Sequence, residues 1–382
     1  MSSDGAADAR PLTIVQLLPA LESGGVERGT LEIASALVAA GHRSIVMSAG
    51  GRLVEQLIVG GSEHITLDVG RKSIFTLRFL PALRRRFREL GADIVHARSR
   101  MPAWMTFLAL RGMDAATRPR FVTTMHGLNS VNAYSAIMTR GERVICVSHS
   151  VREYLLKHYP KTDPARLRVI PRAVDPNEFP RGHRPSSEWH KGFIAEHPAL
   201  STPAPWLCLA ARGTRIKGHG DAIRLVADLR DIGVETRLIL LGVREPGRAQ
   251  YVDALRAAAQ RQGVGDAVVM TSPRRDVRDV MASSQLVLQL SPKPEAFGRT
   301  VVEALNLGVA VLGYDHAGVG EQLRDLFPQG AVKLGDRDAL ATRARELLAS
   351  GVRPQAFDRY RLAQMQAATL AVYRELQEAP RP

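Results

Sequence analysis

Residues 294–307 read PEAFGRTVVEALNL and place two carboxylates, Glu295 and Glu303, eight residues apart. We expect Glu295 to close a loop, the Phe-Gly-Arg-Thr run to open a helix, and Glu303 to lie on the following turns. A helix N-terminus offers free backbone N–H groups and a partial positive charge, which suit a phosphate or sugar oxygens. The stretch therefore predicts a loop and a helix with a ligand site between them. An ordinary amphipathic helix with solvated acids fits it equally well.

A second informative stretch, residues 207–218, reads LCLAARGTRIKG. Its apolar run is expected to be a buried strand that ends near Ala211, and two cations, Arg212 and Lys217, follow. Ligands in open α/β sheets bind outside the carboxyl ends of the strands, so cations at this place favour an anionic ligand. The alternative is a surface loop rich in arginine, and from this stretch alone it is the more common case.

Together, the two stretches resemble the donor site of the retaining glycosyltransferases of family 4, also called group 1 glycosyltransferases, which have the GT-B fold. That family has an arginine five residues before a Lys-Gly pair, matched here by Arg212 and Lys217. It also has two glutamates separated by seven residues with Phe-Gly after the first, matched by Glu295 and Glu303.

Further segments extend the resemblance over most of the chain. They are Gly24-Gly25 after the first expected strand, Met125-His126-Gly127, residues 169–175 between the domains, and Gly318 to Glu321. Residues 96–104, HARSRMPAW, are similar to a segment of lipopolysaccharide-core transferases. Two departures put the subfamily and its donor in doubt: Arg172-Ala173 stands where Asn-Gly is usual, and Ala310 stands where Pro is usual.

The resemblance implies an α/β protein of the GT-B class, with two Rossmann-like domains facing a central cleft. Apolar strand-like stretches alternate with helical ones in both halves of the chain, as βαβ units require. The expected boundaries are an acceptor-side domain at 1–178, a nucleotide-sugar domain at 179–355, and a C-terminal helix at 356–382 that returns to the N-terminal domain. Residues 171–205, rich in Pro, Ser and charge, are expected to be a linker with connecting loops.

The resemblance also implies roles for individual residues. Of the expected catalytic residues, Arg212 and Lys217 would stabilise the leaving diphosphate, while His126 and Glu295 would contact the transferred sugar. The expected donor-binding residues are Gly24, Gly25, Phe297, Gly298, Arg299, Thr300 and Glu303, the last on the ribose. Arg98 and Arg100 follow a strand and would meet phosphates or acidic sugars of the acceptor. A structural role for His126, and plain surface positions for the two arginines, are the alternatives.

The implied activity is a metal-independent, retaining transfer of a hexose from a UDP- or GDP-linked sugar to a glycan or glycolipid. Lipopolysaccharide core or another cell-surface polysaccharide is the expected product, and no cofactor is expected. The alternatives are a GT-B sugar-nucleotide epimerase and a non-catalytic nucleotide- or carbohydrate-binding protein. A nicotinamide-dependent oxidoreductase is disfavoured because residues 18–25 lack the GxGxxG spacing. The acidic pair in Asp336-Arg337-Asp338 resembles a metal site, but a helix N-cap explains it better.

Composition adds limits on compartment and partners. A chain of 382 residues is long enough for two domains. Cys146 and Cys208 lie in apolar runs and are expected to be buried thiols. No signal-peptide pattern and no bilayer-spanning apolar run occur, so we expect a cytoplasmic protein.

The formal net charge is +14, and the basic excess is densest in residues 71–88, RKSIFTLRFLPALRRRFR. We expect this basic segment to hold the protein loosely on the anionic inner face of the membrane, each cation contributing about 1 kcal/mol. Pro81 predicts a break into two shorter helices. A core-packed helix with a basic outer face is the alternative. Nucleic acid is disfavoured as a partner because no nucleic-acid motif is found and aromatic residues are few.

Overall fold

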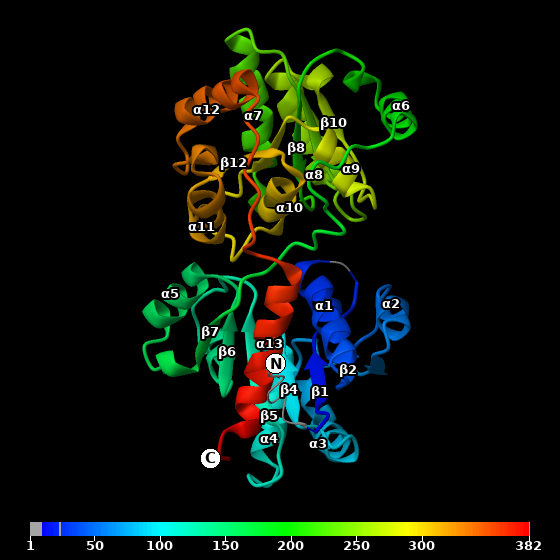
Figure 1. Cartoon of the computed structure of the whole chain (residues 1–382), viewed down its shortest axis with the longest axis vertical. Helices are drawn as coiled ribbons and strands as arrows, with labels where there is room; N and C mark the ends of the chain where they lie inside the picture. Colours follow the sequence, from blue (N-terminus) through cyan, green and yellow to red (C-terminus); the bar gives the residue numbers. More distant parts are fainter. Residues whose placement is uncertain (1–9, 23, 382) are drawn as a thin grey trace, which may run out of the picture. The chain divides into compact units, whose positions relative to one another are not determined.

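A computed structural model describes residues 10–22 and 24–381, and the chain divides into two compact units. The first unit runs to Arg172 and takes in the segment from Leu362 onward, while the second comprises Ala173–Arg361. Each unit holds one parallel sheet with helices packed on it (Figure 1).

The sheet of the first unit has seven strands in the order β3-β2-β1-β4-β5-β6-β7. They are β1 Thr13–Leu17, β2 Arg43–Ser48, β3 Glu63–Thr66, β4 Ile94–Ala97, β5 Arg120–Met125, β6 Arg143–Cys146 and β7 Leu167–Val169. The central strands are buried on both faces, and most of their residues are apolar or threonine. The chain builds outward from β1 in one direction and then, from β4, in the other. Leu17 of β1 pairs with Ala97 of β4 at this switch point.

Among the described residues, six α-helices cover this sheet, and the last of them comes from the C-terminal part of the chain. They are α1 Gly25–Ala39, α2 Val54–Val59, α3 Leu80–Glu89, α4 Arg100–Arg111, α5 His149–His158 and α13 Leu362–Glu378. α13 lies beside α1, and α3 packs against α4 (Figure 1). His96 of β4 is within hydrogen-bond distance of the Tyr373 hydroxyl on α13, at 2.7 Å. The returning helix is therefore part of the core of the first unit.

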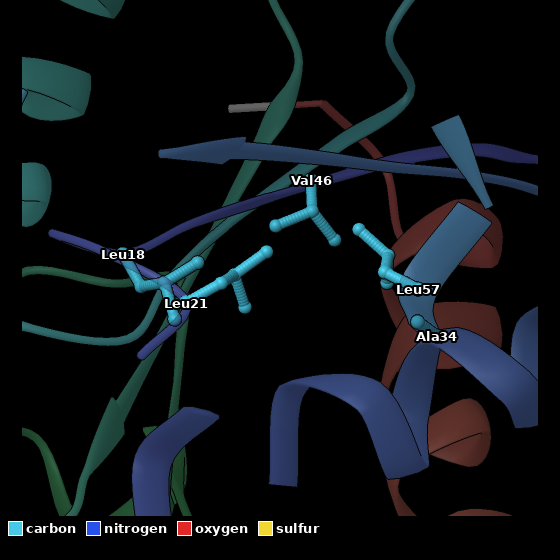
Figure 2. Packing of buried hydrophobic residues seen from close by; sticks show 5 residues of the cluster. All are labelled: Leu18, Leu21, Ala34, Val46 and Leu57. Carbon is cyan, nitrogen blue, oxygen red and sulfur yellow. The ribbon is translucent and has the colours of Figure 1, made fainter. Parts of the chain in front are cut away.

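A buried apolar cluster fixes the connection between β1 and α1. Figure 2 shows its side chains pointing toward one another from β2, α1, α2 and the loop after β1. They are Leu18, Leu21, Ala34, Val46 and Leu57, each no more than 2% exposed. This packing holds the loop that leads to Gly24 and the start of α1.

The sheet of the second unit has six strands in the order β10-β9-β8-β11-β12-β13. They are β8 Trp206–Ala210, β9 Arg237–Leu241, β10 Val268–Met270, β11 Leu286–Gln289, β12 Ala310–Tyr314 and β13 Ala331–Val332. Its helices are α6 Ser187–Glu196, α7 His219–Asp231, α8 Ala249–Arg261, α9 Val277–Ser283, α10 Arg299–Leu307, α11 Ala317–Leu326 and α12 Arg337–Ser350. Here the switch point lies between β8 and β11, where Leu207 pairs with Leu286.

The structure corrects the expected linker at 171–205, because this stretch contains α6. The Ser186 hydroxyl caps the helix by accepting from the Trp189 backbone N–H at 3.1 Å. The Trp189 ring stacks on Phe193 with centroids 5.0 Å apart, and Phe193 is buried. This helix therefore packs on the second unit and is not an open connection.

The basic segment forms two helices, as Pro81 predicts. A 3₁₀-helix, η1, spans Ile74–Phe79, and α3 follows with Pro81 in its first turn, where a missing N–H costs nothing. Leu83 and Phe87 are the buried residues of α3. Among the described residues, no helix has both the length and the apolar character needed to cross a membrane.

Candidate active site

The second unit brings two predicted catalytic residues into contact. The Lys217 ammonium donates to Oε1 of Glu295 at 2.6 Å, and their side chains are 23% and 17% exposed. Lys217 follows β8 and Glu295 follows β11, and these two strands are neighbours at the switch point. Ligands of open α/β sheets bind at this kind of position. Arg212 lies on the same loop as Lys217, with an exposed side chain.

Two glycines allow the Lys217 loop to approach the backbone that follows β11 and β9 closely. Gly218 has φ +78°, and a Cβ on it would lie 1.9 Å from the Leu290 carbonyl oxygen. A Cβ on Gly213 would lie 2.3 Å from the Val243 carbonyl oxygen. The Ser291 hydroxyl also donates to the Ile216 carbonyl at 2.5 Å. The position of Lys217 is thus set by close backbone contacts.

A buried histidine, His219, also holds this loop in place through Tyr251. Sequence reasoning did not single out this residue. His219 is fully buried at the start of α7, with Nδ1 3.1 Å from the Tyr251 hydroxyl. That hydroxyl also donates to the Thr214 carbonyl at 3.2 Å. Burial lowers the pKa of His219 to about 4, so the ring is neutral at pH 7. The sequence signal for this role was the position of the histidine, directly after Lys217-Gly218.

The stretch 294–307 forms the predicted loop and helix. α10 begins at Arg299, after Gly298, which has φ +84° and brings no capping side chain. Gly318, at the start of α11, donates its N–H to the Glu295 carbonyl at 3.0 Å. Gln322 donates to the Phe297 carbonyl and to the Gly318 carbonyl. The starts of α10 and α11 are therefore locked together beside Glu295.

The other predicted donor-binding residues of this unit lie on the first turns of α10 or, for Phe297, just before it. Nε of Arg299 lies 3.5 Å from Oε1 of Glu303, and their side chains are only 12% and 7% exposed. The Thr300 hydroxyl accepts from Gln289 at 3.1 Å. The Phe297 ring is buried, 5.8 Å from Tyr360, so this residue can offer a ligand its backbone but little of its ring.

In the first unit, the predicted residues follow three neighbouring strands. Gly24, after β1, is the N-cap of α1 with φ +141°, and Gly25 is the first residue of the helix. Arg98 directly follows β4, Arg100 opens α4, and His126 directly follows β5. Because parallel neighbours end at the same edge of a sheet, these groups share one edge of the first unit.

His126 is partly buried, and its Nε2 has no hydrogen-bond partner among the described residues. Burial places the pKa of His126 well below its usual value, and positive charge on Arg98 and Arg172 lowers it further. The imidazole is therefore neutral at pH 7 and can exchange a hydrogen bond with a sugar hydroxyl.

Arg98 and Arg100 are not simple surface cations. Arg98 is 3% exposed and donates to the Gln16 amide oxygen at 2.9 Å. Arg100 is partly buried, donates to the Ser135 hydroxyl at 3.2 Å, and lies 5.3 Å from the Tyr134 ring centroid. For Arg98, the alternative of a plain surface position is wrong. Its contact with an acceptor stays a prediction.

Two smaller predictions are confirmed. The Asp336 carboxylate accepts from the Ala339 backbone N–H at 3.0 Å and caps α12. Cys146 and Cys208 are both buried free thiols, and burial raises the pKa of each to about 12, so neither is a ready nucleophile. In the described part of the chain, no three His, Cys, Asp or Glu side chains gather where they would hold a metal ion.

Comparisons with known proteins agree with this fold. The family model described as glycosyltransferase family 4 matches residues 23–178, and the model of the group 1 glycosyl transferases matches residues 193–363. A solved glycosyltransferase from Rickettsia africae is 25% identical with a TM-score of 0.81, over 97% of this chain and 100% of that one. A comparison with curated proteins gave no match.

Two more distant structures share the fold. HepE from Anabaena, solved with UDP-glucose, is 18% identical with a TM-score of 0.73, over 94% of this chain and 100% of that one. WaaG, a glycosyltransferase involved in lipopolysaccharide biosynthesis, is 17% identical with a TM-score of 0.67, over 96% and 95% of the two chains. Since the two family models divide most of the chain between its two units, the protein belongs to the group 1 glycosyltransferases, has the GT-B fold, and carries a family 4 N-terminal domain.

Proposed function

We propose that this protein is a retaining glycosyltransferase that moves a hexose from a UDP- or GDP-linked sugar to a glycan or glycolipid acceptor. We further propose that it acts in the assembly of lipopolysaccharide core or another cell-surface polysaccharide. It works in the cytoplasm without a metal ion, because its own cations take the charge of the leaving group.

The Lys217–Glu295 pair at the switch point of the second unit carries this proposal. Lys217, Arg212 and the amides at the start of α10 offer positive charge to a diphosphate. Glu295 accepts hydrogen bonds from hydroxyls of the transferred sugar, and the buried Glu303 accepts from the ribose. A nucleotide-sugar has all of these parts in one molecule. The structures of HepE with UDP and with UDP-glucose support a donor of this class.

The chemistry we infer is a front-face displacement. The acceptor oxygen bonds to the anomeric carbon on the side from which the diphosphate oxygen departs, so the anomeric configuration is retained. The departing phosphate takes the acceptor proton. Lys217 and Arg212 neutralise the charge that builds up as the bond breaks, and neutral His126 stabilises the sugar through one hydroxyl.

A ligand panel tests the donor site of the proposed enzyme. UDP, GDP, ADP, CMP and NAD would be added to the full chain, with and without divalent metal, in thermal-shift and calorimetric assays. We expect one nucleoside diphosphate to stabilise the protein equally well without metal. A response to NAD alone would support the oxidoreductase alternative. Nucleotide binding with no sugar transfer in the presence of the matching nucleotide-sugar would support the binding-protein or epimerase alternative.

Two single variants should separate donor binding from turnover. Glu303→Ala should weaken nucleoside diphosphate binding about tenfold or more, because a buried acceptor of ribose hydroxyls is lost. His126→Ala should leave that binding within about twofold and lower turnover roughly a hundredfold. Calorimetry and an assay of nucleoside diphosphate release measure the two effects. Normal turnover in the His126 variant would remove this residue from the mechanism.

The basic segment supports the proposed attachment to an anionic membrane. The exposed fractions of Phe75 and Leu77 on η1 are 74% and 38%, although both side chains are apolar. Exposed cations flank them in the sequence, among them Arg71 at 80% and Arg85 at 67%, which pair with Asp68 and Glu89. Apolar side chains among cations suit the boundary between lipid headgroups and acyl chains.

Removing one apolar and one basic group from this segment should weaken membrane binding. The double variant Phe75→Ser with Arg78→Gln is expected to bind vesicles containing anionic lipid at least tenfold more weakly, because both apolar insertion and charge attraction decrease. Vesicle sedimentation measures the effect. The control applies the same changes on the second unit, as Ile232→Ser with Arg261→Gln. An equal loss in both double variants would count against the segment.

A further inference from the structure

Arg98 is a buried cation that forms no ion pair with any carboxylate in the described part of the chain. Its guanidinium donates through Nη1 to the neutral amide of Gln16, and its Nε is buried without a hydrogen-bond partner. Burial lowers the pKa of Arg98 to about 10, so the group is still charged at pH 7. Tyr373 and the charge on Glu32 oppose this lowering only in part.

Arg120, in the same unit, is a buried arginine that has a counterion. Arg120 is also buried, at 7% exposed, but it pairs with Glu142 at 2.8 Å. A buried charge without a counterion costs several kcal/mol, and a buried polar atom without a partner adds to that cost. Arg120 therefore has a carboxylate in direct contact, whereas Glu32, the carboxylate whose charge acts on Arg98, forms no direct ion pair with it among the described residues.

A small cavity in the first unit meets Arg98. Its polar lining comes from His96, Arg98, Thr124, Arg172 and Thr369. His96 already uses both ring nitrogens, on Tyr373 and on Thr124, and its pKa lies well below the usual value because of burial, so it adds no charge. Arg98 and Arg172 are therefore the charged residues in the lining of the cavity. No carboxylate lines it among the described residues.

The cavity lies near the edge of the sheet where β4 and β5 end, and where the predicted site residues of the first unit are found. Arg98 follows β4 directly, at the switch point with β1, and His126 follows the adjacent strand β5. The charge on Arg98 acts on His126 strongly enough to lower its pKa. An anion bound at Arg98 would therefore lie near the histidine that we assign to the transferred sugar.

We propose that Arg98, supported by Arg172, binds a single anionic group of the acceptor, a carboxylate or a phosphate ester, and that the enzyme thereby selects acidic acceptors. The inference rests on the proposed function, since it takes the first unit to be the acceptor side. A planar guanidinium suits both kinds of oxyanion, because its N–H groups match their geometry.

The test uses the full chain and small probes that differ only in charge. Glucuronate, glucose 6-phosphate and neutral glucose would be titrated by calorimetry at fixed ionic strength, beside inorganic phosphate and chloride. We expect one acidic sugar to bind at least tenfold more tightly than glucose, and the sugar that binds identifies the group as carboxylate or phosphate. Arg98→Gln should lower that affinity at least tenfold, and Arg98→Lys should lower it by less.

Arg120→Gln is the matched control, because it removes an equally buried arginine that has its own counterion. It should lower the melting temperature and leave acidic-sugar binding within twofold. If Arg98→Gln does not fold, Arg98→Lys carries the test. Equal binding of glucose and the acidic sugars, unchanged binding in the Arg98 variants, or equally tight binding of inorganic phosphate or chloride, meaning an adventitious ion only, would overturn the proposal. Nucleoside diphosphate binding in the same variants shows separately whether the donor site is intact.

Discussion

Lys217→Met is expected to lower kcat/KM for the nucleotide-sugar roughly a hundred- to a thousandfold. The ammonium lies at the strand edge where the diphosphate is proposed to leave, and it is held there by Glu295 at 2.6 Å. A fixed charge aimed at a leaving group lowers the barrier because it needs no reorganisation during the reaction. Methionine keeps most of the length of the side chain and removes the ammonium group. Steady-state release of nucleoside diphosphate measures the effect.

Lys333→Met is the control for Lys217→Met, because Lys333 is an exposed lysine of the same unit. It should change kcat/KM less than twofold. Glu295→Gln provides a second comparison, since it keeps Lys217 and removes the carboxylate that orients it. If Lys217→Met and Lys333→Met had the same activity, the charge of Lys217 would have no part in the reaction.

Gly218→Ala is expected to reduce the free energy of unfolding of the second unit by about 3 kcal/mol and to abolish most activity. The residue has φ +78°, which costs an alanine about 1 to 2 kcal/mol. Its Cβ would also meet the Leu290 carbonyl oxygen at 1.9 Å, so the Lys217 loop must move away from β11. Urea unfolding of the full chain, followed by tryptophan fluorescence, measures the loss.

A variant at Gly233 distinguishes the cost of the positive φ from the cost of the close contact made by the added Cβ. It has the same φ of +78°, but a Cβ there would have nothing within 4 Å. Gly233→Ala should therefore cost only about 1 kcal/mol and leave activity unchanged. Equal costs at the two glycines would show that backbone strain, and not the close approach to β11, dominates at Gly218.

Local pattern was enough to predict most of the strands and the start of α10. Mainly apolar runs such as Ile94–Ala97 and Ala310–Tyr314 are strands, because parallel strands buried on both faces consist mostly of apolar residues. Phe-Gly before Arg299 marked a helix start because glycine adopts the positive φ needed there. Two short strands, β7 and β13, were not predicted, since runs of two or three residues carry little pattern.

The environment of the candidate site residues was not predictable in the same way. Whether Arg98 is exposed or buried depends on Gln16, 82 residues earlier in the chain. The contact of His96 with Tyr373 spans 277 residues. α6 was missed because its stability comes from aromatic packing, with His190 stacked on Trp206 at 5.1 Å, and not from a regular apolar stripe. Such contacts depend on the folded topology, which local sequence does not specify.

The return of the chain to its first unit has a consequence for synthesis in the cell. The first unit lacks α13 until the ribosome has made the whole second unit, Ala173–Arg361. At about 5–20 residues per second, this interval lasts roughly 10 to 40 s. During that time, the side of α1 that packs against α13 is uncovered, and His96 has no hydrogen bond to Tyr373. The second unit has all of its strands and helices before the first is complete, so the order of folding can run against the order of translation.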